Sequence, residues 1–355
     1  MTSPGDKSLA ICAGAIFALV TAVAATRADQ LTVNGHHYAG ARVVGVAGGR
    51  VEFRTAAGET RQADFAHVDI LLVERGDAFA DFNQAERYAS ENEWGNALLR
   101  YKRAARLSEG FWSDVIAARM LRAAVRAKRL DEATAAYLRV VRAETAGPLA
   151  ALSLFPTNLP TIRDAAATRA LQQLDDAVRA NPGPDQRLAI DLLGYEILRS
   201  LRDPQAVQVG VRLTDTEIPA ALRIDRVYSS ILTALDQRLA DAAPPEAMAA
   251  LNRAMTHCPS VDLADLLLLK GRTLLREAKS REDLIRASWP FLRVVAHMPE
   301  DPRAAEGLLG AAKCVERLSR KDKATELLRE CLAHRAISDA TTKLAKAELE
   351  RLAKP

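Results

Sequence analysis

The spacing of apolar residues changes once along the chain. Through residues 29–76, apolar and polar positions alternate, so that Val51 and Phe53 face one side and the residues between them the other. A period of two is typical of half-buried β-strands. Beyond this region glycine becomes sparse and the apolar period lengthens to about three and a half, as in amphipathic helices. The pattern predicts a small β-domain over 29–76 and a helical region over 78–333.

Turn signals divide the β-domain into short strands. Asn34-Gly35 and Gly48-Gly49 favour tight hairpins, because two-residue hairpin turns need positive φ. The run before Val73 is apolar and β-branched, as expected of a buried strand. The predicted strands are 31–33, 38–46 with a bend at Gly40, 51–55, 60–64 and 68–73. Five short strands resemble a small SH3-like or Sm-like barrel, which is marginally stable alone and would pack against the helices that follow.

A three-position pattern recurs through the helical region. It consists of an alanine, a large apolar or aromatic residue four positions later, and a small or apolar residue three positions after that, as in Ala97, Tyr101 and Ala104. The intervals between the leading alanines are 36, 37, 36, 41, 40 and 37 residues. The leading alanines are Ala97, Ala133, Ala170, Ala206, Ala247, Ala287 and Ala324. This recurrence predicts stacked helix pairs, in which small residues allow close approach and large ones fill the space between pairs.

These copies resemble the tetratricopeptide-repeat family over about three quarters of the chain, most clearly at residues 78–140 and 261–333. The resemblance implies a right-handed solenoid of about seven helical hairpins, with residues 334–355 as a C-terminal capping helix. The sequence departs from the family at Gly210, where a bulky residue is expected, and before Ala170, where two prolines interrupt the helix. The predicted fold class is mainly α, with a small N-terminal β-domain.

Residues 1–28 have the layout of a secretory signal peptide. Lys7 precedes an uncharged, alanine-rich stretch from Leu9 to Thr26, and small residues lie three and one positions before a cleavage site ahead of Asp29. An uncleaved anchor is the alternative, since 18 uncharged residues can just span a bilayer. We therefore expect an exported protein, periplasmic or extracellular, with membrane contact only if this segment is retained.

Composition narrows the function classes. Apolar residues make up 49% and charged residues 26%, close to a soluble globular average. The net charge of +4, from 49 basic and 45 acidic residues, gives no case for a nucleic-acid partner. The sequence has no phosphate-binding glycine loop, serine nucleophile elbow, zinc-binding His-Glu helix motif or Cys-x-x-Cys pair. His36 and His37 would point to opposite faces of a strand. We expect no enzyme, no cofactor and no metal site.

Three cysteines follow the signal segment: Cys258, Cys314 and Cys331. An odd number in an exported protein leaves at least one thiol free or intermolecular. Cys314 and Cys331 lie on successive predicted helices, so they would either pair with each other or serve as small apolar core residues.

A row of basic residues is the main candidate for a binding surface. Spacings of three, four and three place four arginines on one helix face: Arg119, Arg122, Arg126 and Arg129. The tetratricopeptide resemblance implies that the first helix of each pair lines a concave groove, with Lys313 and Arg317 in equivalent places in the last copy. Guanidinium groups suit carboxylates, so the expected ligand is an acidic peptide segment or a C-terminus. A solvated charged face is the alternative.

The resulting expectation is an exported, non-enzymatic scaffold or adaptor that binds a protein partner, with cell-envelope assembly as the setting that the resemblance implies. The alternative is a module that binds cell-wall material or a polysaccharide through its β-domain. That alternative needs exposed aromatic residues, and we expect Tyr38, Phe53 and Phe65 in the core of the β-domain.

Overall fold

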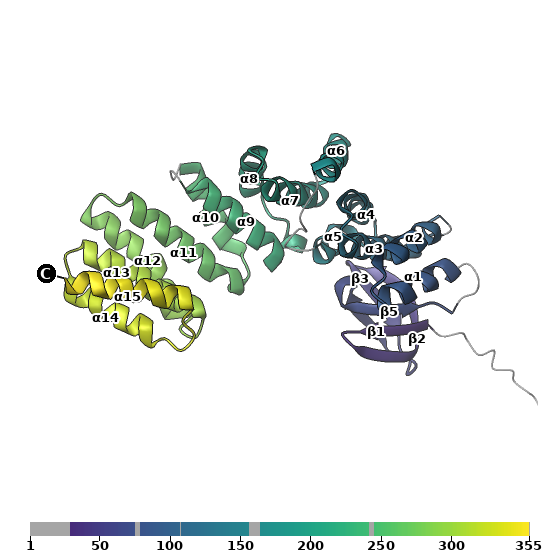
Figure 1. Ribbon diagram of the computed structural model, residues 1–355, viewed down its shortest axis with the longest axis horizontal. Helices are drawn as coiled ribbons and strands as arrows, with labels where there is room; N and C mark the ends of the chain where they lie inside the picture. The colour runs from purple at the N-terminus through teal and green to yellow at the C-terminus, as the bar shows by residue number, and fades with distance from the viewer. Residues whose placement is uncertain (1–28, 75–78, 107, 156–163, 241–244, 355) are drawn as a thin grey trace, which may run out of the picture.

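The chain is mainly helical, with a small β-sheet at its N-terminal end (Figure 1). The computed structural model describes residues 29–74, 79–106, 108–155, 164–240 and 245–354. The predicted signal peptide over 1–28 therefore lies outside the described residues. From the sheet the helices follow an arc: α1 to α5 lie beside the sheet, and α11 to α15 form the far end (Figure 1).

Five antiparallel strands form the sheet, in the order β4-β3-β2-β1-β5. They are β1 (Asp29–Val33), β2 (His36–Ala47), β3 (Arg50–Arg54), β4 (Thr60–Asp64) and β5 (Val68–Leu72), with the 3-10 helix η1 (Phe65–His67) before the last. All five predicted strands are confirmed. The long β2 pairs first with β1 and then with β3, and Gly40 (φ 72°) lies near this change of partner, as the predicted bend requires.

The sheet is not closed, in contrast to the expected barrel, because β4 and β5 lie at its opposite edges. Helix side chains take the place of a closing strand along β5. Glu86 accepts a hydrogen bond from the backbone N–H of Leu71 (2.9 Å). Asn83 accepts from the N–H of Val73 (2.8 Å) and donates to its carbonyl (2.9 Å). These bonds satisfy backbone groups that an open edge would otherwise offer to another strand.

Fifteen α-helices follow within the described residues, and successive helices pack against one another along most of the chain. The helices are α1 (Ala80–Ser90), α2 (Trp94–Ala104), α3 (Phe111–Arg126), α4 (Leu130–Arg142), α5 (Gly147–Leu154), α6 (Asp164–Arg179), α7 (Pro184–Ser200), α8 (Gln205–Asp215), α9 (Asp225–Arg238), α10 (Pro245–His257), α11 (Ser260–Glu277), α12 (Arg281–His297), α13 (Pro302–Arg317), α14 (Lys321–Ala333) and α15 (Asp339–Ala353).

The recurring alanines occupy equivalent places in the fold. Each lies on an even-numbered helix from α2 to α14, and all seven are at most 3% exposed. The large residues four positions later are buried as well: Tyr101, Tyr137, Leu174, Leu251, Phe291 and Leu328. The pattern read from the sequence therefore marks the packed face of every second helix.

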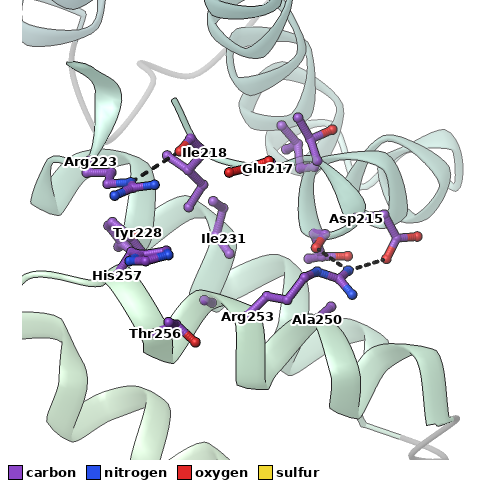
Figure 2. A pocket seen from close by; sticks show the side chains of 14 residues that line it. Asp215, Glu217, Ile218, Arg223, Tyr228, Ile231, Ala250, Arg253, Thr256 and His257 are labelled. Carbon is purple, nitrogen blue, oxygen red and sulfur yellow. Dashed lines mark hydrogen bonds and ion pairs between the residues drawn. The ribbon is translucent and has the colours of Figure 1, made fainter. Parts of the chain in front are cut away.

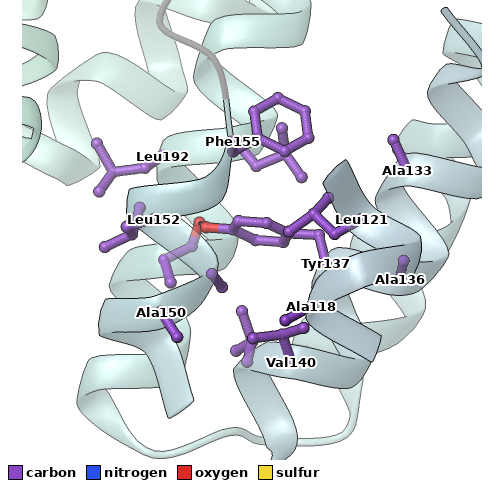
Figure 3. Packing of buried hydrophobic residues seen from close by; sticks show 14 of the residues in the cluster. Ala118, Leu121, Ala133, Ala136, Tyr137, Val140, Ala150, Leu152, Phe155 and Leu192 are labelled. Carbon is purple, nitrogen blue, oxygen red and sulfur yellow. Dashed lines mark hydrogen bonds between the residues drawn. The ribbon is translucent and has the colours of Figure 1, made fainter. Parts of the chain in front are cut away.

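Tyr137 on α4 shows how the large residue of a repeat copy packs against neighbouring helices. Its ring lies among side chains of α3, α4 and α5 (Figure 3), and meets the ring of Phe155 edge-on with centroids 5.4 Å apart. Its hydroxyl donates to the carbonyl of Ala189 on α7 (2.8 Å). Burial raises the pKa of Tyr137, which keeps this donor protonated. One side chain of α4 thus packs against α3 and α5 and also bonds to α7.

Gly210, the departure from the pattern, has a packing reason. A Cβ at this position would lie 3.2 Å from the ring of Tyr195 on the preceding helix. Tyr195 is fully buried, and its hydroxyl donates to Gln237 on α9 (3.1 Å). The ring that fills this space therefore comes from α7 instead of α8, and glycine leaves room for it.

The predicted C-terminal helix is present as α15. Its N-terminal cap is Ser338, whose hydroxyl accepts from the N–H of Thr341 (3.1 Å). Cys314 and Cys331 are both buried and free, so they are core residues rather than a disulfide.

Candidate partner-binding groove

The structure places Arg119 at the junction between the helices and the sheet. Its side chain is 5% exposed, its Nη1 donates to the carbonyl of Val68 (2.6 Å), and its Nε lies 3.0 Å from Oε1 of Glu86. Glu86 is 1% exposed and also accepts from the Tyr101 hydroxyl and the Leu71 N–H. A buried carboxylate needs such compensation. Arg119 therefore holds the edge of β5 and does not face an open groove.

The two neighbouring arginines of the predicted row also bind within the chain. Arg122 donates to the same Val68 carbonyl (2.8 Å), and its pKa is lowered by burial and by the charge of Arg119. The guanidinium of Arg126 lies 6.0 Å from the centroid of the Trp94 ring on α2, which is within cation–π range. The α3 arginines are thus engaged by β5 and α2.

Lys313 and Arg317, the predicted residues of the last copy, line a hollow at the C-terminal end of the chain. This C-terminal groove lies between α11, α13 and α15 and has a volume of about 680 Å³. Its apolar lining includes one aromatic ring and four leucines: Phe291, Leu268, Leu275, Leu309 and Leu344. The groove is therefore large enough for several side chains of a ligand and apolar enough to hold them.

Cations outnumber carboxylates around the C-terminal groove. The cations are Arg272, Arg276, Lys313, Arg317 and Arg351, and the carboxylates are Glu306, Glu316 and Glu348. On the α15 side, Arg351 pairs with Glu316 and with Glu348 (2.7 Å), and Lys313 lies 3.5 Å from Glu348. Glu316 and Glu348 are thus already paired, Glu306 on α13 forms no ion pair with a described residue, and the α11 side of the groove has Arg272 and Arg276.

Two of these cations serve the fold. Arg317 donates to the carbonyls of Leu275 (2.6 Å) and Ala278 (2.7 Å), at the C-terminal end of α11, where carbonyls lack intrahelical partners. Arg276 likewise donates to the carbonyl of Ala240 (2.6 Å). Arg272 differs, since its exposed side chain makes no hydrogen bond or ion pair with any other described residue. Arg272 is therefore the cation most available to a ligand.

The floor of the groove contains the ring of Phe291, which the recurring sequence pattern predicts only as the large packing residue of the copy that begins at Ala287. Phe291 belongs to α12, behind the groove, and its ring reaches the groove between two glycines. A Cβ on Gly271 of α11 would lie 2.7 Å from this ring, and a Cβ on Gly310 of α13 would be closer still. Glycine at both positions leaves room for the ring.

A second hollow, of about 310 Å³, lies between α8, α9 and α10 (Figure 2). Its arginines are held by the chain: Arg253 lies 3.4 Å from Asp215, and Nε of Arg223 donates to the carbonyl of Ile218 (3.3 Å). His257 also lines it. Because both of its arginines are already engaged and its volume is smaller, we place the candidate site in the C-terminal groove.

The aromatic residues of the sheet do not form an exposed platform. Phe53 and Phe65 are each 2% exposed, and the ring of Tyr38 packs edge-on against Phe53 with centroids 5.1 Å apart. A sugar ring would need an exposed aromatic face. Phe53 and Phe65 belong to the core, as the sequence predicts, whereas Tyr38 is half-buried and packs against that core.

Two searches of the described residues and two comparisons gave negative results. No group of three or more His, Cys, Asp or Glu side chains in this part of the chain could hold a metal ion. None of the described helices combines the length and hydropathy that crossing a membrane requires. No protein-family model matches the chain, and no curated protein shows significant similarity to it.

Proposed function

We propose that this protein is a non-enzymatic adaptor that binds a segment of a protein partner in the C-terminal groove. The observation that carries the proposal is the composition of that groove, in which leucines and a phenylalanine ring lie beside an excess of cations. An apolar surface with a few fixed polar groups is typical of a ligand site. A peptide with an apolar anchor and acidic side chains matches both parts of the lining.

The charges favour an acidic segment. Arg272 has no partner among the described residues, and Lys313 holds Glu348 only at 3.5 Å. Both can therefore turn to a carboxylate of the ligand, and charge-assisted bonds of this kind are stronger than neutral ones. Leu344 is 54% exposed at the groove and would be covered by the same ligand.

The wider setting follows from the sequence. The recurring alanines on every second helix support a tetratricopeptide-like solenoid, in which paired helices stack and present one face to a ligand. The layout of residues 1–28 supports export. We therefore place the adaptor outside the cytoplasm, with envelope assembly as its setting.

The test is a crosslinking pull-down from the producing cells. It compares the unmodified protein with the double variant Arg272→Glu/Leu344→Ser and with the control Arg329→Glu, a reversal on exposed α14 that lines neither hollow. We expect one protein partner, recovered with the control and reduced at least tenfold with the double variant. Equal recovery with all three proteins, or recovery of wall material alone, would overturn the proposal.

A further inference from the structure

One helix carries a set of apolar side chains on its exposed face. On α12, Trp289 is 61% exposed, Leu292 42% and Ile285 38%. Their spacings of four and three residues place them on one side of the helix, which we call the outer stripe. Phe291, which reaches the C-terminal groove, is buried on the other side of α12. The outer stripe is therefore a separate surface.

Positive charge flanks the outer stripe. Arg286 and Arg293 are exposed, and neither forms a hydrogen bond or ion pair with another residue in the described part of the chain. Of the two carboxylates on α12, Asp283 is used in the capping box with Ser280. Glu282, in the first turn, is the other. Helix α12 thus has three arginines, Arg281, Arg286 and Arg293, against these two carboxylates, and it keeps an excess of positive charge although Arg286 also interacts electrostatically with Asp283.

We propose that the outer stripe docks an acidic amphipathic helix of a protein partner. The stripe extends over eight residues of helix, from Ile285 to Leu292, or about 10 Å, which is the spacing at which an amphipathic helix presents its own apolar anchors. Glutamate or aspartate beside those anchors would pair with Arg286 and Arg293, and such complementarity fixes the choice of partner. Trp and Arg are also the residues that most often dominate binding energy at interfaces.

Two other occupants of the outer stripe, a second copy of this chain and an anionic bilayer, are less favourable than an acidic helix. A second copy of this chain, paired stripe to stripe, would bring the arginines of both copies to one seam, with Glu282 as the available carboxylate. An anionic bilayer would gain only about 1 kcal/mol for each arginine near its surface, and three apolar side chains add little buried area. Both remain as distinct outcomes of the test.

The test titrates the full chain with two designed helical peptides. Both carry leucines with spacings of four and three; one has glutamates beside them and the other has lysines. The readout is the emission of Trp289, taken as the difference between the unmodified protein and Trp289→Phe. We expect a saturable shift to shorter wavelength with the glutamate peptide and at least tenfold weaker binding of the lysine peptide. Arg286→Glu/Arg293→Glu should reverse this preference.

The controls separate the alternatives. Leu99→Ser removes a similarly exposed leucine from α2 and should leave peptide binding unchanged. Light scattering and vesicles of phosphatidylglycerol are run beside the titration. The proposal is overturned by equal binding of the two peptides, by no saturable binding, by a doubled mass that Trp289→Ser abolishes, or by a shift with vesicles alone. The glutamate peptide also suits the C-terminal groove, whose residues are unchanged in every variant, but the Trp289 difference signal reports binding at the outer stripe alone, so failure here leaves the proposal for the groove standing.

Discussion

The ring of Phe291 packs directly against the backbone of Gly310, so that no side chain fits at that glycine. Gly271 meets the same ring from α11, and the three residues together join α11, α12 and α13. The arrangement fills a closely packed interior in which even one additional methyl group must displace its neighbours.

Replacing Gly310 therefore gives the first prediction. Gly310→Ala should lower the free energy of unfolding by about 1–3 kcal/mol, because the new Cβ would overlap the Phe291 ring. The matched control is Gly95→Ala on α2, where a Cβ meets no atom within 4 Å. That change should be neutral or stabilising by about 0.5–1 kcal/mol. Urea unfolding measures the stability of both variants against the unmodified protein. If Gly310→Ala is as stable as Gly95→Ala, the Phe291 ring can move aside.

The second prediction concerns the buried carboxylate at the sheet edge. Glu86→Ala should cost about 3–5 kcal/mol, because it leaves Arg119 buried without its partner. The exposed pair of Arg50 and Asp64 provides the control, since Asp64→Asn should cost less than about 1 kcal/mol. Hydrogen exchange adds a local readout: the Leu71 N–H should lose protection in Glu86→Ala. Unchanged protection would mean that the edge is held by other bonds.

The third prediction concerns pH. Burial, with repulsion from Asp225 and Asp265, raises the pKa of Asp262 to about 6. Between this value and the unfolded value near 4, the folded state binds more protons, so this group's contribution to stability falls as pH rises from about 4 to about 6. Asp262→Asn should therefore be more stable than the unmodified protein at pH 7 by about 1 kcal/mol, since the carboxylate is partly solvated. The two proteins should converge near pH 4; a constant difference across this range would contradict the assignment.

The fourth prediction separates the two groups of basic residues. Arg122→Glu should lower the free energy of unfolding by about 1–3 kcal/mol, because it removes the bond to Val68 at the sheet edge. Arg272→Glu should leave stability unchanged within about 0.5 kcal/mol, since its side chain is exposed and makes no bond to other described residues. Thermal unfolding compares them. A destabilised Arg272→Glu would show that this arginine supports the fold.

Local pattern accounts for what the sequence could predict. Alternation and turn glycines located all five strands, and the recurring alanines located the packed faces of seven helices, because both signals depend on residues close together in the chain. The role of Arg119 could not be found in this way. Its partner, Val68, lies 51 positions earlier and is reached only once the sheet has docked on α3.

In the candidate site, too, local pattern predicted some residues, while contacts between residues distant in the chain could not be predicted. The tetratricopeptide resemblance implied that Lys313 and Arg317 line a groove, yet Arg317 is bound to the end of α11, a contact that no local pattern contains. Gly210 departs from the pattern of its copy because the ring of Tyr195, from the preceding helix, fills the space beside it, a contact that the local pattern does not contain.

The bonds along β5 have a consequence for the order of assembly. The strand is translated before α1 and α3, yet its outer backbone groups are satisfied by side chains on those helices, namely Glu86, Asn83, Arg119 and Arg122. A nascent chain that ended at residue 74 would present an unprotected strand to any neighbour able to pair with it. We therefore expect β5 to reach its finished state only after α1 and α3 have formed, and a chaperone or a rapid appearance of α3 to govern the yield of folded protein.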